Sequence, residues 1–376
     1  MIEFTNTDGF IKDFETIINM DSASDNPEGI KALAHWFQKR FSALGLEAEL
    51  VFPGDGSVPC LEARMGKAPY DIMFLGHMDT VFATGEAARR PFSIEGDRAF
   101  GPGVCDMQGG LLVVLHALET LKAQGKLSAM NLVVAFNGDE EVGSKASREW
   151  IEETAQKSRH TLVYEPCRPG YKVVSQRKGG GWFHLTARGK ETHVGADPEN
   201  GANAVLELAH QTLKITRDLN DGAIGTAAHV TVFNGGDKVN VMPATATASV
   251  DIRIGKSSEQ QRVNDYFSGL PNHIHVAGAE LEITGRVDRP PLELSPASLT
   301  LLDTILSTGQ SLGLTMDHLA TGGCSDANFT SAQGTPTIDG LGLVGANSHR
   351  EDEYVELSSI PPMVALSANL CCRLTP

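Results

Sequence analysis

The residues best suited to chemistry are three consecutive acids, Asp139-Glu140-Glu141, which follow a short apolar segment at 131–137. An apolar run ended by turn formers is typical of a strand buried on both faces. Carboxylates at the end of such a strand repel one another and lose hydration unless a cation or a shared proton is present. We therefore expect a metal ion bound by Glu141, with Glu140 taking a proton from metal-bound water. A solvated acidic helix start is the alternative.

A second candidate pair follows another buried apolar segment, 71–76, where one residue separates His77 from Asp79. Alternation along an extended chain points both side chains to the same side. The Asp79 carboxylate could then accept one imidazole proton and leave the other ring nitrogen of His77 for a metal. On its own, this pair favours a core histidine hydrogen-bonded to a loop aspartate.

Three other segments add one candidate ligand each. Asp106 lies in a glycine-rich turn before an apolar helix, where its alternative role is to cap that helix. Glu165 ends a third apolar run, at the edge where open α/β sheets place their sites, and His349 lies beside an acidic loop. With His77 and Glu141 they make a set of two histidines and three carboxylates, suited to two zinc ions that share one carboxylate.

Short apolar strands that alternate with helices must position these residues. The pattern at 10–50 predicts helices that stop at Gly45, and residues 109–121 predict a buried helix. Such alternation predicts an α/β fold with a mostly parallel sheet flanked by helices. His116 and His210 lie within helical patterns, and we expect them to be packing or surface residues.

A smaller α+β unit is predicted from residue 179 onward. Its expected strands are 182–187, 229–233, 244–254 and 281–285, and its expected helices are 202–219 and 259–267. A chain of 376 residues exceeds the size of one core, about 250–300 residues. We therefore expect residues 1–178 and 290–376 to form one domain, with residues 179–289 inserted into it.

Composition restricts the partners. The formal net charge of −16 disfavours nonspecific binding to nucleic acid. The six cysteines show no metal-ligand spacing and no disulfide framework, which fits reduced thiols in a cytoplasm. The first residues are acidic where a secretory leader is basic, and no segment is expected to reach the length of a membrane span, about 20 apolar residues. We expect a soluble, cytoplasmic protein with no membrane partner.

With these motifs in this order, the chain resembles the dizinc metallopeptidase family of aminoacylases, acetylornithine deacetylases, succinyl-diaminopimelate desuccinylases and glutamate carboxypeptidases. The glutamate carboxypeptidase branch is the most similar in spacing. The resemblance implies a zinc-exopeptidase-like catalytic domain with an inserted ferredoxin-like lid that mediates homodimerisation. It implies that His77 and Glu165 bind one zinc ion, that Glu141 and His349 bind the other, and that Asp106 bridges the two.

The resemblance also implies roles around the metal ions. Asp79 would orient His77, and Glu140 would act as general base and then general acid. Two positions depart from the family pattern: Gln108 stands where a lysine is common, and Cys105 precedes the bridging acid. Neither change removes a ligand.

The substrate side of the site is implied by the same resemblance. His193 corresponds to the lid histidine that reaches the partner subunit's active site and stabilises the developing oxyanion. Arg289, in preference to Arg286, would bind the substrate carboxylate. The residues implied to bind substrate are His193, Asn240, Arg289, Gly322 and Gly323.

These features together predict a metallopeptidase or amidohydrolase. We expect it to cut an amide or peptide bond next to a free carboxylate, as a glutamate-type carboxypeptidase, with two Zn²⁺ ions for which Co²⁺ or Mn²⁺ could substitute. The alternative is an N-acyl-amino-acid deacylase of the acetylornithine or succinyl-diaminopimelate type. A non-catalytic metal-binding peptide binder would have lost a ligand or the base, and a phosphate-ester hydrolase would need cations near 139–142, which the sequence lacks.

Overall fold

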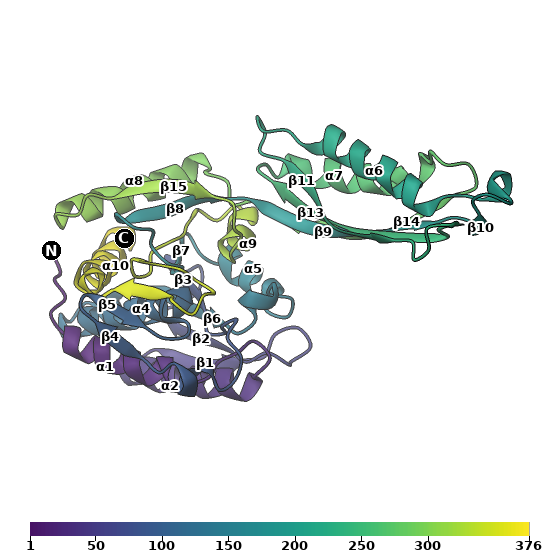
Figure 1. Ribbon diagram of the computed structural model, residues 1–376. Coiled ribbons are helices and arrows are strands. Elements are labelled where there is room, and N and C mark those ends of the chain that lie inside the picture. The colour runs from purple at the N-terminus through teal and green to yellow at the C-terminus, as the bar shows by residue number, and fades with distance from the viewer. Residues whose placement is uncertain (376) are drawn as a thin grey trace. The chain divides into compact units, whose positions relative to one another are not determined.

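The chain divides into two compact units (Figure 1). The computed structural model describes residues 1–375 of the 376. Unit 1 comprises Met1–Gln176, Leu294–Ala320 and the segment from Ser325 onward; unit 2 comprises Arg177–Glu293 and Thr321–Cys324. The sequence predicted domain boundaries after residues 178 and 289. In the structure, unit 1 gives way to unit 2 after Gln176, and unit 2 gives way to unit 1 after Glu293.

Unit 1 is built on a six-stranded sheet. Its strands, in spatial order, are β1 (Glu47–Val51), β2 (Cys60–Met65), β6 (Leu132–Asn137), β3 (Ile72–His77), β7 (Thr161–Val163) and β16 (Thr337–Ile338). The pairs β6–β3, β3–β7 and β7–β16 are parallel, and every residue of β3 and β6 is buried. This confirms the mostly parallel α/β sheet. The antiparallel edge formed by β1 and β2 was not predicted, because no strand was assigned to the segment that follows the predicted helix stop at Gly45.

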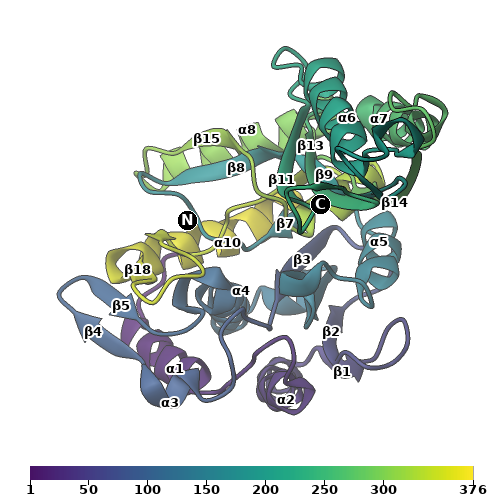
Figure 2. The ribbon, with the colours of Figure 1, turned by 45° about the vertical axis from the view of Figure 1, so that its right-hand side comes forward.

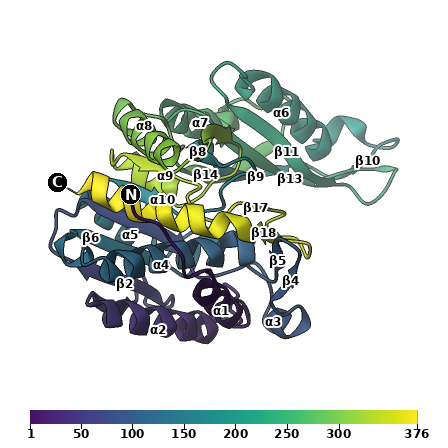
Figure 3. The same cartoon turned by 90° about the vertical axis from the view of Figure 1, so that its left-hand side faces the viewer.

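Helices cover both faces of this sheet. The helices of unit 1 are α1 (Thr7–Ile18), α2 (Pro27–Leu44), α3 (Glu86–Arg89), α4 (Gly109–Ala123), α5 (Arg148–Gln156), α8 (Pro296–Ser311), α9 (Ala327–Ala332) and α10 (Ile360–Leu374). Helices α4 and α10 lie side by side on one face, and α5 and α9 lie on the other (Figures 1 and 3). Helix α2 ends at Gly45, whose left-handed φ of 98° suits glycine.

The central helix of unit 1 is unusually apolar. The segment Val104–Ala123, with 20 residues, is long and apolar enough to cross a membrane by length and composition, contrary to the expectation that no segment would be. Because 83% of its most apolar window is buried inside the protein, it is accounted for as the core helix on which the sheet, α1 and α10 pack.

Two smaller sheets join distant parts of the chain. Strands β17 (Gly345–Ala346), β18 (Tyr354–Glu356), β5 (Arg98–Phe100) and β4 (Ser93–Glu95) form a four-stranded antiparallel sheet, seen in Figure 2 as the C-terminal β18 beside the blue strands β5 and β4. Strand β8 (Lys172–Arg177) pairs with β15 (Asp317–Thr321). The β18–β5 pair brings the loop that contains His349 next to the turn that contains Asp106.

Unit 2 has the ferredoxin-like topology that the family resemblance implies. Strands β9 (Gly179–Arg188), β11 (Ala227–Gly235), β13 (Thr245–Ile254) and β14 (Glu280–Arg289) form an antiparallel sheet in the order β11-β13-β9-β14. Helices α6 (Ala204–Leu219) and α7 (Ser258–Gly269) cover one face (Figure 1). The core includes Phe183 stacked on Phe267, with ring centroids 3.7 Å apart. A separate two-stranded ribbon consists of β10 (Thr192–His193) and β12 (Val241–Met242).

Candidate active site

Three parallel strands deliver side chains to one edge of the unit 1 sheet. His77 is the last residue of β3 and lies in register with Asn137, the last residue of β6. On the other side of β3, the chain leaves β7 and reaches Glu165 two residues later. Because parallel strands end at the same edge, the segments after β3, β6 and β7 meet there, as open α/β sheets require of a site.

The five predicted ligands converge at this edge. His77 Nε2 lies 3.2 Å from Asp106 Oδ1 and 3.6 Å from Glu165 Oε1. His349 Nε2 lies 3.3 Å from Asp106 Oδ2 and 3.2 Å from Glu141 Oε2. The two oxygens of Asp106 therefore face different histidines, and each histidine also faces a second carboxylate. This is the arrangement that a bridging carboxylate between two ions requires.

The spacing and the chemistry of these atoms fit zinc. Ligands about 2.0–2.1 Å from a tetrahedral ion lie roughly 3.3 Å from one another, which matches the four distances above. Ligand atoms of His77, Asp106 and Glu141 all lie within 4.8 Å of one another. In addition, Glu141 Oε1 is buried without a hydrogen-bond partner. A cation between these groups would satisfy that oxygen.

The electrostatics of the cluster centre on the histidines. Burial opposes ionisation of Asp106, but hydrogen bonds from His349 and His77 prevail and hold its pKa below the ordinary value. Hydrogen bonds to Asp106 and Glu141 raise the pKa of His349 to about 10. Burial alone would lower the pKa of His77, yet Asp106 and Asp79 raise it well above the usual value. Positive charge is thus favoured at both imidazoles, the places where cations would bind.

The carboxylate of Asp79 accepts several hydrogen bonds from residues of the site. It is fully buried and accepts the backbone N–H groups of Glu140 at 3.1 Å and Glu141 at 3.2 Å, and the hydroxyl of Ser24 at 2.7 Å. Its Oδ1 lies 3.4 Å from His77 Nδ1, which is also 3.0 Å from the Asp79 carbonyl oxygen. Asp79 can therefore orient His77 and, beyond what the sequence suggested, fix the backbone of the acidic run.

The three consecutive acids have different surroundings. Asp139 is buried and accepts the N–H of Ala146 at 2.8 Å and the hydroxyl of Ser147, so it closes the turn after β6. Glu140 and Glu141 begin a single 3₁₀ turn, Glu140–Val142, and not the solvated helix of the alternative interpretation. Glu140 is half-buried, and the side chain of Glu141 is only 6% exposed.

The turn that carries Asp106 is anchored by a residue that the sequence did not indicate. Asp106 makes no capping bond to α4, whose cap residue is Gln108. Instead, the backbone N–H groups of Cys105 and Asp106 donate to Glu353 Oε1 at 2.7 and 2.8 Å. Gln108 donates to the carbonyl oxygen of Met78 at 2.8 Å. The local sequence does not distinguish Glu353 from its neighbours, because it belongs to an acidic loop whose residues are expected to be exposed to solvent.

The predicted substrate-binding residues fall into two groups within unit 2. His193 and Asn240 belong to the β10–β12 ribbon, where the Val194 N–H donates to the Asn240 carbonyl oxygen at 3.2 Å. Arg289 lies opposite Gly180 at the start of β9, and Gly323 lies near that start, where its carbonyl oxygen accepts from Arg177 at 3.3 Å.

The ten residues of β9 separate these two groups, and at about 3.3 Å per residue they span roughly 30 Å. Gly322 is exposed beside Gly323 and belongs to the second group. His193 and Arg289 therefore do not meet within one unit 2, so a single copy of this unit cannot present both to one small substrate.

His193 has a defined hydrogen-bonding state. Its Nδ1 accepts the backbone N–H groups of Gly195 and Ala196, each at 3.2 Å. A neutral imidazole with Nδ1 as acceptor carries its proton on Nε2. The exposed His193 ring therefore offers an N–H donor, as a group that stabilises an oxyanion must.

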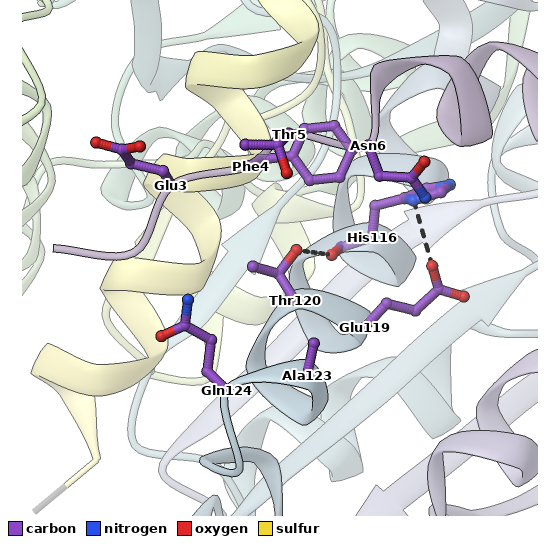
Figure 4. A pocket seen from close by; sticks show the side chains of 9 residues that line it. All are labelled: Glu3, Phe4, Thr5, Asn6, His116, Glu119, Thr120, Ala123 and Gln124. Atoms are coloured by element: carbon purple, nitrogen blue, oxygen red, sulfur yellow. Dashed lines mark hydrogen bonds and ion pairs between the residues drawn. The ribbon is translucent and has the colours of Figure 1, made fainter.

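A second ionisable cluster lies at the other end of α4 (Figure 4). The His116 ring is buried and packs against Phe10 at a tilt of 36°, with ring centroids 4.9 Å apart, so it is a packing residue as predicted. His116 and Glu119 line a cavity of about 390 Å³ together with the N-terminal segment 3–6. Arg40 contacts Asp13 at 2.7 Å and Glu119 at 2.5 Å.

The α/β sheet and the histidine–carboxylate cluster at its carboxyl edge define a hydrolase of the metal-dependent class. The chain belongs to peptidase family M20/M25/M40, whose model matches residues 73–373. It is 31% identical over 373 residues to carboxypeptidase G2 from Pseudomonas sp. (strain RS-16), covering 97% of this chain and 89% of that protein.

Desuccinylases are also among the relatives. A succinyl-diaminopimelate desuccinylase from Gluconacetobacter diazotrophicus is 29% identical over 346 residues, covering 85% of this chain and 86% of that one. Among solved structures, aminopeptidase PepT from Bacillus cereus superposes with a TM-score of 0.78 at 21% identity, with 99% of each chain covered. The metallo-carboxypeptidase Sso-CP2 from Sulfolobus solfataricus gives 0.71 at 16% identity, covering 96% of this chain and 98% of that one. These two likenesses concern the fold alone.

Proposed function

We propose that this protein is a dizinc carboxypeptidase that removes a C-terminal glutamate-type residue from a small peptide or peptide-like amide. The observation that carries the proposal is Asp106, whose two oxygens face His77 and His349 at 3.2 and 3.3 Å. The likeness to carboxypeptidase G2 over 97% of the chain supports the carboxypeptidase reaction.

The distances support the ligand assignment. His77 and Glu165 would hold one ion, His349 and Glu141 the other, with Asp106 shared between them. When bound, zinc ions lower the pKa of a coordinated water toward about 7 and polarise a carbonyl group.

Glu140 supplies the proton transfer in this proposal. Its backbone is fixed by Asp79, and it adjoins the ligand Glu141, so its carboxylate can take the proton of the attacking water. The same carboxyl group then returns the proton to the leaving nitrogen. The tilt of the His77 ring is set by Asp79 throughout.

Substrate recognition falls to unit 2. Arg289, with Gly322 and Gly323 near it, would bind the free carboxylate of the substrate. His193 Nε2–H would donate to the developing oxyanion, with Asn240 beside it in the same ribbon. Because the two groups lie at opposite ends of β9, we propose a homodimer in which His193 serves the partner subunit's site.

Deacylation of an N-acyl amino acid is the second candidate. The desuccinylase relatives, which share 29% identity over 85% of the chain, favour it, since the same site would cleave an N-succinyl amide. The bond, the nucleophile and the free carboxylate are equivalent in both reactions, and only the group on the acyl side differs.

One set of measurements decides between these reactions. Metal analysis of the purified protein should find close to two zinc ions per chain. Release assays should then compare peptides ending in glutamate or aspartate with N-succinyl and N-acetyl amino acids at equal concentration. A higher kcat/KM for glutamate-terminated peptides supports the carboxypeptidase, whereas a higher value for N-succinyl substrates would replace it with the deacylase. A chain that binds no metal and releases no product would overturn both.

A further inference from the structure

Glu353 is a buried acid in an exposed loop. Its side chain is fully buried, whereas Glu351, two residues earlier, has a side chain that is 70% exposed and pairs with Arg89 at the surface. Burying a carboxylate costs several kcal/mol unless partners compensate for the lost hydration. A buried glutamate at this position therefore needs a specific set of partners.

Those partners are three backbone N–H groups of one turn. Glu353 Oε1 accepts from Cys105 at 2.7 Å and from Asp106 at 2.8 Å, and Oε2 accepts from Gly103 at 3.2 Å. Gly103 has a left-handed φ of 79°, which helps the turn direct these N–H groups to one side. The turn thus binds the carboxylate as a backbone anion site.

This contact joins two ligand-bearing segments that are far apart in the chain. Glu353 lies four residues after His349 in the same loop. The next residue, Tyr354, pairs with Phe100 in the small sheet. Asp106 itself donates the 2.8 Å bond. The position of the shared aspartate relative to His349 is therefore fixed through Glu353.

We propose that Glu353 is a positioning residue that sets the distance between Asp106 and His349, and with it the geometry of the ion held by His349 and Glu141. This inference rests on the proposed dizinc function. Burial raises the pKa of Glu353 to about 8, and the N–H bonds from Asp106, Cys105 and Gly103 act in the opposite direction. The ionised form fits the turn, because it offers two acceptor oxygens and no donor to these three N–H groups. Loss of this anchor lets the two ligand segments separate while every ligand remains present.

The test compares Glu353→Gln with Glu351→Gln, a matched change in the same loop outside the site. Glutamine keeps the shape but directs an NH₂ group at a backbone N–H. For Glu353→Gln we expect zinc affinity and kcat each to fall 10- to 100-fold, the range for residues that orient metal ligands, with KM within twofold of the parent. Glu351→Gln should match the parent protein in all three.

A spectroscopic measurement separates positioning from stability. The Co²⁺-loaded Glu353→Gln protein should show an altered visible absorption band, because the coordination geometry changes, while far-ultraviolet circular dichroism matches the parent. A lower Tm with unchanged kcat, metal affinity and cobalt spectrum would overturn the inference, since Glu353 would then only stabilise the fold. A parent protein that binds no metal would instead overturn the proposed function.

Discussion

Two clusters of histidine and carboxylate groups lie at opposite ends of α4, and they balance their charge differently. The cluster near the C-terminal end of the helix contains Asp13, Glu119 and His116 together with Arg40, which contacts both acids. Burial opposes ionisation of Asp13, but bonds from His116 and Arg40 hold its pKa below the ordinary value. A permanent guanidinium charge thus neutralises these acids within the protein.

The candidate active site has no such charge among its five ligands. Three carboxylates face two imidazoles, groups that give up a proton near neutral pH and then offer nitrogen to a metal. Similar residue types therefore make a structural network in one place and the proposed metal site in the other. The difference is whether the chain supplies its own cation.

The largest expected effect is on turnover, and it separates the two clusters by function. Glu140→Gln should lower kcat by about 10²–10⁴-fold, the usual contribution of a general base, with zinc content unchanged. Glu119→Gln, a matched change in the Arg40 cluster, should keep the parent kcat. The measurements are steady-state kinetics and metal analysis; full activity in Glu140→Gln would remove Glu140 from the mechanism.

A smaller effect is expected on stability from the metal itself. Zinc that binds only the folded protein should raise the free energy of unfolding by about 2.7 kcal/mol at a free concentration 100 times Kd. Urea denaturation with and without buffered zinc measures this difference. The stabilisation should disappear in Asp106→Asn and persist in His116→Gln. The reverse result would place the metal in the Arg40 cluster and contradict the proposed site.

Removing the internal cation tests the other half of the comparison. Arg40→Met leaves Asp13 and Glu119 without their guanidinium partner, and we expect a loss of about 1–3 kcal/mol in unfolding free energy. Zinc content and kcat should not change. A variant as stable as the parent in urea would show that Arg40 does not neutralise this cluster.

The smallest effect is expected for the pH dependence of the metal-free protein, because the His349 side chain is 52% exposed and solvent screens its interactions. The folded-state pKa of His349 is about 10, above the 6.5 of an unfolded histidine, because of its bonds to Asp106 and Glu141. Its stabilisation is therefore complete below pH 6.5 and is lost as pH rises through 10.

Urea midpoints measured in a chelator should accordingly fall across this range, and the fall should be smaller in His349→Gln. Zinc binding should show the opposite trend and tighten as pH rises, because protons leave the imidazole. A chelated parent protein whose midpoint stays level or rises over this interval would contradict the pKa of His349.

The sequence predicted what depends on local pattern. The buried strands β3 and β6 read as apolar runs, so the residues that follow them could be placed at one edge of a sheet. The contact between Glu353 and the backbone of Asp106 could not be predicted. Glu353 and Glu351 lie in the same acidic segment of the sequence, and they differ only in what the folded protein packs against them.

Two further features were beyond local pattern. Strand β1 is short and none of its residues is fully buried, so its sequence lacks the apolar run that marks β3 and β6 as strands. The separation of His193 from Arg289 follows from the length of β9, and chain order alone does not show which ends of a sheet two loops occupy.

The ligand side chains differ in their access to solvent, and this has a consequence for metal exchange. His77 is 2% exposed and Glu165 9%, whereas His349 is 52% exposed. An ion held by His349 can lose a ligand to water by a simple side-chain rotation; one held by His77 requires the sheet edge to open. In a dizinc protein of this geometry, a chelator would strip the outer ion first and leave a one-metal form that can be refilled with a different ion.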